Sequence, residues 1–211
     1  MPTGAAPKWM VRSAWVLALG WPLSIHCAVL LGAPEWGPRL TAIAAVLGAL
    51  LWAAATRRAY AFALAGALGA LLGGLAVAAP ALLLFAPPVL INALLAFLFG
   101  ASLRSGRDPI ISVFARMEQG VLPADLARYT RVLTWLWTGL FVAMAGTALA
   151  LALLGPLALW STFTNVVAYA LVAALFVGEY LYRRWRYRQY RHATLIELAA
   201  NVRSAGVFTR K

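Results

Sequence analysis

Charged and metal-binding side chains are scarce in this sequence. Of its 211 residues only 11% are charged, and it has six acidic residues, two histidines and one cysteine. The single cysteine, Cys27, cannot form an intramolecular disulfide, and the histidines and cysteines are too few to build a metal site. The sequence also lacks a glycine-rich phosphate loop, a Cys-x-x-Cys pair and a nucleophile elbow. We therefore expect no metal and no cofactor. Whether the protein is an enzyme stays open, although the missing catalytic signatures favour a protein without catalytic activity.

Hydrophobic residues, in contrast, make up 64% of the chain. A soluble fold of this length could not bury so much apolar surface, and apolar runs of about 20 residues are typical of transmembrane helices. The pattern predicts an all-α fold, a polytopic membrane helix bundle with six spans and short interfacial helices. The spans are expected at about residues 14–32, 39–55, 60–79, 81–103, 131–154 and 157–182. The first is read as an uncleaved span, because it is too long for a signal peptide and no clear cleavage site follows.

The basic residues are distributed unevenly between the loops. With the N-terminus in the cytoplasm, the cytoplasmic segments contain 17 of the 18 lysines and arginines, and only Arg39 lies on the other side. Basic loops are retained in the cytoplasm, so both termini are predicted to be cytoplasmic. The net charge of +12 does not indicate nucleic acid as a partner, because basic residues between spans set topology and attract anionic lipid headgroups.

Two cytoplasmic segments carry most of the polar sequence. The loop 104–130 contains a predicted amphipathic helix at 109–119, for which Asp108 is a suitable N-cap. The apolar residues of this helix repeat at helical spacing: Ile110, Val113, Phe114 and Met117. The segment 183–211 is a basic tail. Both segments are predicted to lie at the inner leaflet.

Charged residues near the cytoplasmic ends of the spans form the candidate binding site, a pocket or docking face at the inner leaflet. They are Arg104, Arg107, Asp108, Arg116, Arg131, Glu179 and Arg183. Glu179 and Arg183 are spaced i, i+4, which a local ion pair would explain. The alternative is a charged pocket that Glu179 forms with Arg104 and Arg107. No catalytic residue can be assigned.

Three polar residues lie inside predicted spans: His26, Asn92 and Asn165. Polar side chains in such positions indicate either a functional site or hydrogen bonds within and between helices. His26 could bond a backbone carbonyl that a proline one turn earlier leaves free. Asn92 follows Pro87 and Pro88, which should bend the fourth span.

Aromatic and small residues give two further expectations. Tryptophans mostly flank the predicted spans, as in an aromatic belt, so we expect Trp160 near the outer interface and Trp137 near the inner one. The third span has small residues four apart, which favour close helix packing inside one chain or in a homo-oligomer. They are Gly69 and Gly73 in one row, and Gly66, Ala70 and Gly74 in another.

Several motifs between about residues 85 and 192 carry a family resemblance. They include Arg104-Ser-Gly-Arg-Asp-Pro-Ile-Ile-Ser-Val-Phe-Ala-Arg116, Gly120-Val-Leu-Pro123, Ala127-Arg-Tyr-Thr-Arg131 and Val177-Gly-Glu-Tyr-Leu-Tyr-Arg-Arg184. The chain thereby resembles a bacterial membrane-protein family encoded among genes for aryl-polyene (xanthomonadin-type) pigment and fatty-acid-like biosynthesis. The resemblance implies a multi-pass protein of the bacterial inner membrane. It also implies, as partners, strongly acidic acyl carrier proteins or biosynthetic enzymes.

Three functions stay open. The first is a non-catalytic membrane component of polyene or lipid biosynthesis that anchors or docks cytoplasmic carrier proteins or enzymes at the inner leaflet. The second is a transporter or flippase of a lipid-like product, with a cavity near Asn92, His26 and Asn165. The third is an intramembrane acyl or glycosyl transferase with Glu179 as general base. The basic cytoplasmic face favours the first.

Overall fold

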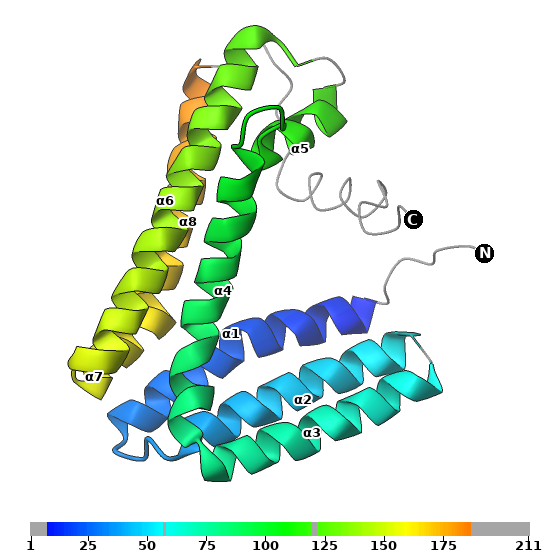
Figure 1. Cartoon of the computed structure of the whole chain (residues 1–211), viewed down its shortest axis with the longest axis vertical. Coiled ribbons are helices and arrows are strands. Elements are labelled where there is room, and N and C mark those ends of the chain that lie inside the picture. The colour runs from blue at the N-terminus through cyan, green and yellow to red at the C-terminus, as the bar shows by residue number, and fades with distance from the viewer. Residues whose placement is uncertain (1–7, 57, 120–121, 187–211) are drawn as a thin grey trace. The chain divides into compact units, whose positions relative to one another are not determined.

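The computed structural model describes residues 8–56, 58–119 and 122–186, which form helices joined by short turns and contain no strand. The elements are α1 (Lys8–Leu30), α2 (Trp36–Thr56), α3 (Ala59–Ala78), α4 (Pro80–Ser102), α5 (Ile110–Gln119), α6 (Ala124–Leu154), α7 (Leu157–Thr162), the π-helix η1 (Phe163–Val167) and α8 (Ala168–Arg186) (Figure 1). The basic tail predicted at 183–211 is described only as far as Arg186, and the remainder lies outside the described residues.

Of the described helices, five are long and apolar enough to cross a membrane. They are α2, α3, α4, α6 and the continuous run Leu157–Arg186, which combines α7, η1 and α8. These helices give the chain the character of a multi-pass membrane protein. The span predicted at 14–32 is not among them, because the apolar part of α1, Val16–Leu30, is shorter than the roughly 20 residues that cross the hydrocarbon core. The sixth span therefore stays a prediction.

Prolines account for two helix starts, because a proline in the first turn lacks only a donor that the helix does not need. Pro38 is the third residue of α2, and Pro80 is the first residue of α4. Accordingly α2 begins at Trp36, ahead of the predicted span at 39–55. Pro87 and Pro88, which were expected to bend the fourth span, lie inside α4 without ending it.

The chain divides into two compact units. The first unit contains Met1–Leu90 and Gly146–Ala170, and the second contains Ile91–Ala145 and Leu171–Lys211. The divisions fall within α4, α6 and α8, so each of these helices contributes residues to both units.

The core of the first unit is built around a buried tryptophan. Ile25 of α1 and Leu84 of α4 pack with Trp160 of α7, and the ring of Phe85 meets the Trp160 ring edge-on, with centroids 4.9 Å apart. Trp160 is only 1% exposed. The indole therefore packs in the helix core and does not face outward as a belt residue would, while its depth near the outer interface stays a prediction.

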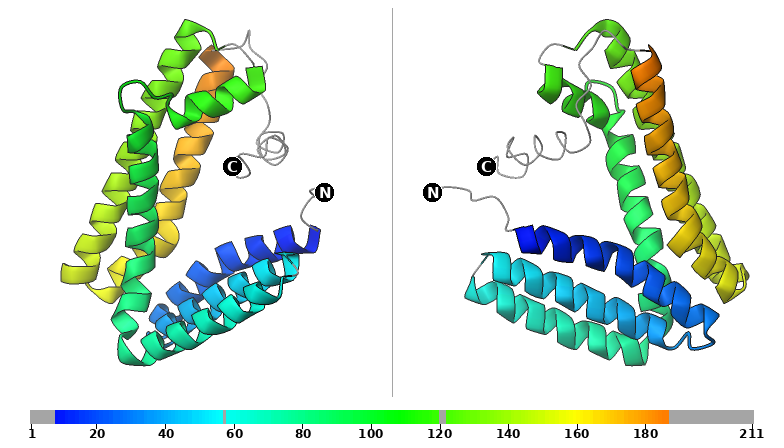
Figure 2. Two further views of the ribbon diagram at one scale, coloured as in Figure 1. Left: turned by 45° about the vertical axis from the view of Figure 1, so that its right-hand side comes forward. Right: turned by 180° about the vertical axis from the view of Figure 1, so that it is seen from behind.

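In the same unit α2 and α3 lie side by side (Figures 1 and 2). A Cβ atom on Gly69 would lie 3.6 Å from a methyl group of Val46, so the small residue lets α3 approach α2 closely. Around Gly66, Gly73 and Gly74 no described neighbour comes within 4 Å of the corresponding position. The close packing is thus intramolecular at Gly69, and a homo-oligomer through the other glycines stays a prediction.

The core of the second unit follows one face of α6. Leu133, Trp137 and Phe141 recur every four residues and are all buried. Phe99 of α4 meets the Phe141 ring with centroids 5.3 Å apart, and Leu175 of α8 packs on the same cluster. Trp137 is 6% exposed, so it packs in the helix core and does not face outward as a belt residue would, while its depth near the inner interface stays a prediction.

Candidate functional site

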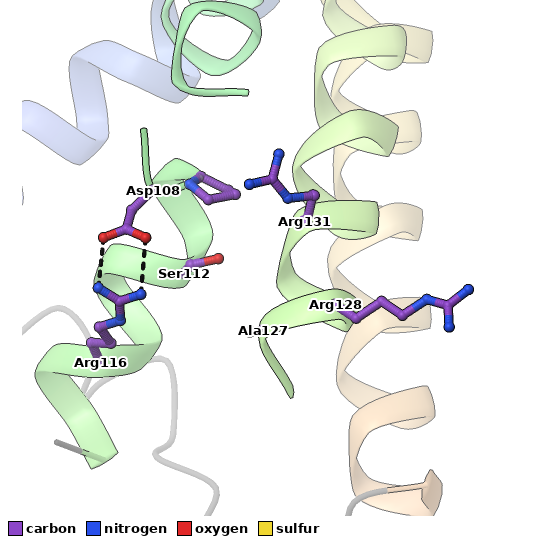
Figure 3. A pocket seen from close by; sticks show the side chains of 7 residues that line it. Asp108, Ser112, Arg116, Ala127, Arg128 and Arg131 are labelled. Carbon is purple, nitrogen blue, oxygen red and sulfur yellow. Dashed lines mark hydrogen bonds and ion pairs between the residues drawn. The ribbon is translucent and has the colours of Figure 1, made fainter. Parts of the chain in front are cut away.

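A pocket of about 290 Å³ lies in the second unit, between α5 and the first turns of α6 (Figure 3). Its lining residues are Asp108, Pro109, Ser112 and Arg116 on the α5 side, and Ala127, Arg128 and Arg131 on the α6 side. Three of the seven charged candidates from the sequence, Asp108, Arg116 and Arg131, therefore come together here. The helix α5 occupies Ile110–Gln119, where the sequence predicted one at 109–119. Its location at the inner leaflet stays a prediction.

A pair of buried hydroxyl groups holds α5 against α6. The side-chain oxygens of Ser112 and Thr130 are 2.6 Å apart, and both residues are buried. Thr130 already donates its proton to the carbonyl oxygens of Leu126 and Ala127, at 3.0 and 3.1 Å. The arrangement that gives both hydroxyl protons an acceptor has Ser112 donating to Thr130, because a hydroxyl has only one proton. Ser112 consequently has no proton left for a ligand and acts by positioning α5.

Ser102, the last residue of α4, fixes the turn that leads to α5. Its hydroxyl donates to the carbonyl of Phe99 at 2.6 Å and accepts the amide of Ile110 at 3.0 Å, which satisfies the first amide of α5. The guanidinium of Arg131 adds a longer bond of 3.4 Å to the carbonyl of Leu103. These bonds connect the turn to the end of α4, to the start of α5 and to α6.

The carboxylate of Asp108 forms a bidentate ion pair with Arg116, at 2.6 and 2.9 Å (Figure 3). The side chains are each 48% exposed, so the pair is a surface interaction of modest strength. The prediction that Asp108 caps α5 is wrong, because its oxygens bind Arg116 and Ser102 supplies the bond to the first amide.

The remaining charge of the pocket is positive. Three arginines and one aspartate line it, and the Asp108–Arg116 pair leaves the charges of Arg128 and Arg131 uncompensated within the pocket. The guanidinium of Arg131 extends toward the turn that carries Asp108, whereas that of Arg128 points away from α5 (Figure 3). Neither arginine forms an ion pair with a described residue.

The other four charged candidates lie outside this pocket. Arg104 and Arg107 are exposed on the turn before α5, and neither lines the pocket. Glu179 and Arg183 form the local ion pair that their spacing predicts, with Arg183 Nε 3.2 Å from Glu179 Oε1. None of Glu179, Arg104 and Arg107 lines the α5–α6 pocket, so a charged pocket formed by these three residues stays a prediction.

Glu179 is engaged from a second direction. Tyr129 of α6 donates its hydroxyl to Glu179 Oε1 at 3.2 Å, and the Tyr129 ring stacks on Tyr182 with centroids 5.6 Å apart. The side chains of the ion pair are only 12% exposed at Glu179 and 21% exposed at Arg183. A carboxylate held by a phenol and a guanidinium stabilises the contact between α6 and α8, and both of its described partners belong to the protein.

Two of the three polar residues predicted inside spans meet in the first unit, at Ser161. His26 Nδ1 lies 3.0 Å from Ser161 Oγ, and Asn165 Nδ2 donates to the same oxygen at 3.2 Å. The partner of His26 is therefore a side chain rather than a freed carbonyl. The third polar residue, Asn92, is half-buried on the part of α4 that belongs to the second unit.

Asn165 lies in the π-helical stretch η1, which the sequence did not predict. Thr164 and Asn165 donate side-chain hydrogen bonds to the carbonyls of Trp160 and Ser161, four residues earlier, at 2.8 and 3.0 Å. Such turns are rare and often occur at functional sites. Ser161 was not among the candidate residues, although its i, i+4 spacing from Asn165 was a usable signal.

The chemistry of the α5–α6 pocket is that of a binding site. Its carboxylate is paired and its serine proton is engaged, so no free acid or base lines it. In the described part of the chain, no three His, Cys, Asp or Glu side chains gather closely enough to hold a metal ion. No family model, curated protein or solved structure matches this chain. The geometry of the site therefore carries the functional conclusion.

Proposed function

We propose that this chain is a non-catalytic, multi-pass component of the bacterial inner membrane that docks acidic cytoplasmic proteins at the inner leaflet. It has six spans and cytoplasmic termini in this proposal. The docked proteins are acyl carrier proteins or enzymes that assemble polyenes or related lipids. The docking surface, called the basic platform below, consists of Arg104, Arg107, Arg128 and Arg131.

The observation that carries the proposal is the rigid attachment of the segment between α4 and α6. A connection that only linked two spans would not need the cap from Ser102 and the buried Ser112–Thr130 bond. These contacts hold the turn and α5 in place and leave all four arginines of the platform exposed. A positive surface of fixed geometry attracts and orients an acidic partner.

The test measures binding of an acyl carrier protein in its holo form to the purified chain in nanodiscs of zwitterionic lipid. The variant Arg104→Gln/Arg107→Gln removes two charges from the platform outside the pocket. The control Arg58→Gln/Arg184→Gln removes two exposed arginines elsewhere, each of which bonds a tyrosine hydroxyl. We expect roughly tenfold weaker binding at low salt for the platform variant and little change for the control. Equal binding of the carrier protein by both variants would show that the platform is not the docking site.

The transporter is a second candidate, favoured by the His26–Ser161–Asn165 network beside a π-helical turn. A polar chain of this kind among apolar helices can mark a substrate path. His26→Ala and Asn165→Ala separate the two functions, because a transporter would lose flux of its lipid-like product and a docking protein would keep carrier binding. We do not propose a transferase, since Glu179 is held by Tyr129 and Arg183.

A further inference from the structure

The hydrogen-bond donors of the α5–α6 pocket all belong to guanidinium groups. A guanidinium has five N–H donors, and Arg131 uses one of them for its 3.4 Å bond to a carbonyl among the described residues. Ser112 donates to Thr130, and Asp108 accepts from Arg116. A ligand in this pocket therefore meets donors and positive charge.

These donors select for an anion with several acceptor oxygens. Pro109 and Ala127 add apolar surface to the lining, so a cation or a neutral sugar would find few partners there. Guanidinium groups match the oxygens of phosphate in both charge and geometry, and neither Arg128 nor Arg131 has a carboxylate partner in the pocket.

An apolar surface continues from the pocket along α6. Trp135 follows Arg131 by four residues, and Val132 and Leu136 follow Arg128 by four and eight, so they lie on the same side of the helix. Their side chains are exposed by 61%, 52% and 55%, respectively. Two arginines followed by an open apolar stripe reproduce the order of a phospholipid, a phosphate and then hydrocarbon.

We infer that the α5–α6 pocket binds a phosphate ester between Arg131 and the outer N–H groups of Arg116, that Arg128 adds positive charge at the edge of the pocket, and that an anionic membrane phospholipid supplies the phosphate. The inference rests on the proposed location of this segment at the cytoplasmic membrane surface. It assigns α5 a second role, as one wall of a lipid site that shares Arg128 and Arg131 with the basic platform.

The test is a titration of the purified chain in detergent with short-chain phosphatidylglycerol and, in a separate arm, with inorganic phosphate. Arg128→Gln/Arg131→Gln should bind the lipid about tenfold or more weakly, because a hydrogen bond to a charged group is worth about that factor. Arg58→Gln/Arg184→Gln removes the same charge elsewhere and should bind normally. Arg131→Lys, which retains the charge and loses the planar fork, should fall between them.

The two arms identify the source of the phosphate. Loss of lipid binding by the pocket variant, with negligible binding of inorganic phosphate to the native chain, establishes the lipid site. If inorganic phosphate binds tightly and its binding depends on Arg128 and Arg131 in the same way, the pocket is still an anion site. Its ligand is then a soluble phosphate rather than a lipid. The proposal is overturned if both double variants bind the lipid as well as the native chain, or lose it equally.

The carrier-protein assay separates this inference from the proposed function. Arg104→Gln/Arg107→Gln should weaken carrier binding and leave phosphatidylglycerol binding intact. Failure of the lipid titration alone overturns the phosphate site and leaves the docking surface standing. Failure of the carrier assay alone overturns docking and leaves the phosphate site standing.

Discussion

The hydroxyl of Ser112 on α5 donates to the hydroxyl oxygen of Thr130 on α6 across 2.6 Å, in a site where both side chains are buried. The direction follows from the two carbonyls to which Thr130 gives its own proton. This bond joins α5 to the long helix α6, which carries Arg128 and Arg131, so the geometry of the pocket depends on it.

Thr130→Val should therefore loosen α5. Thr162→Val is the matched control, because Thr162 bonds only a carbonyl of its own helix and has no partner on another described helix. Loss of the Ser112–Thr130 bond should cost about 1 kcal/mol and raise the amide exchange of α5 about fivefold relative to the control. The measurement is hydrogen–deuterium exchange in detergent. Equal exchange in the two variants would show that another contact holds α5.

Asp108→Asn should change the charge of the α5–α6 pocket more than it changes the stability of the fold. The Asp108–Arg116 pair is half-exposed, so its loss should cost less than about 1 kcal/mol and matter less at high salt. The released Arg116 should then strengthen phosphatidylglycerol binding. Asp125→Asn, at an exposed position in the first turn of α6, makes the same charge change away from the ion pair. Weaker lipid binding by Asp108→Asn than by Asp125→Asn would contradict the assigned role of Arg116.

Glu179→Gln should destabilise the chain more than Asp108→Asn does. Arg183 is mostly buried, and removing its counter-charge leaves a desolvated guanidinium, a loss of about 2 kcal/mol or more. Tyr129 can still donate to the amide oxygen of the glutamine. Thermal unfolding in detergent, with the exposed Glu35→Gln as control, measures the difference. A melting temperature equal to that of the control would mean that the ion pair contributes nothing.

His26 should carry its proton on Nε2 when the ring is neutral. Asn165 donates to Ser161 Oγ, and the only described acceptor for the Ser161 proton is His26 Nδ1. Nitrogen chemical shifts of labelled histidine in bilayers distinguish the two tautomers. Ser161→Ala should remove the preference, because the donor to Nδ1 is lost. If the neutral His26 ring of the native chain carried its proton on Nδ1, His26 would be the donor and Ser161 the acceptor, which would contradict this assignment.

Local features of this fold were predictable from sequence. Helix lengths follow from apolar runs, α5 from its heptad-like spacing, and the Glu179–Arg183 pair from a spacing of four within one helix. Each depends on residues that are neighbours along one helix, where geometry is fixed by the period of 3.6.

Contacts between helices were not predictable in the same way. The partner of Ser112 lies 18 residues away and that of His26 lies 135 residues away, and nothing in a single sequence selects these pairs. The burial of Trp160 was missed for the same reason, because its position near a span end fits both an outward-facing belt residue and a core residue. The role of Asp108 was missed in the same way, because its carboxylate binds Arg116, eight residues further on, while Ser102 accepts the first amide of α5.

The central claim is that the segment between α4 and α6 faces the cytoplasm. It is tested most directly by labelling single cysteines with a membrane-impermeant maleimide, after Cys27→Ser removes the native thiol. Ser105→Cys, on the turn before α5, and Glu35→Cys, before α2, are separated by the three apolar helices α2, α3 and α4. The account predicts that Ser105→Cys reacts only in inside-out vesicles and Glu35→Cys only in right-side-out vesicles. Reaction of Ser105→Cys in right-side-out vesicles would place the arginines on the wrong side for any cytoplasmic partner and would contradict the account.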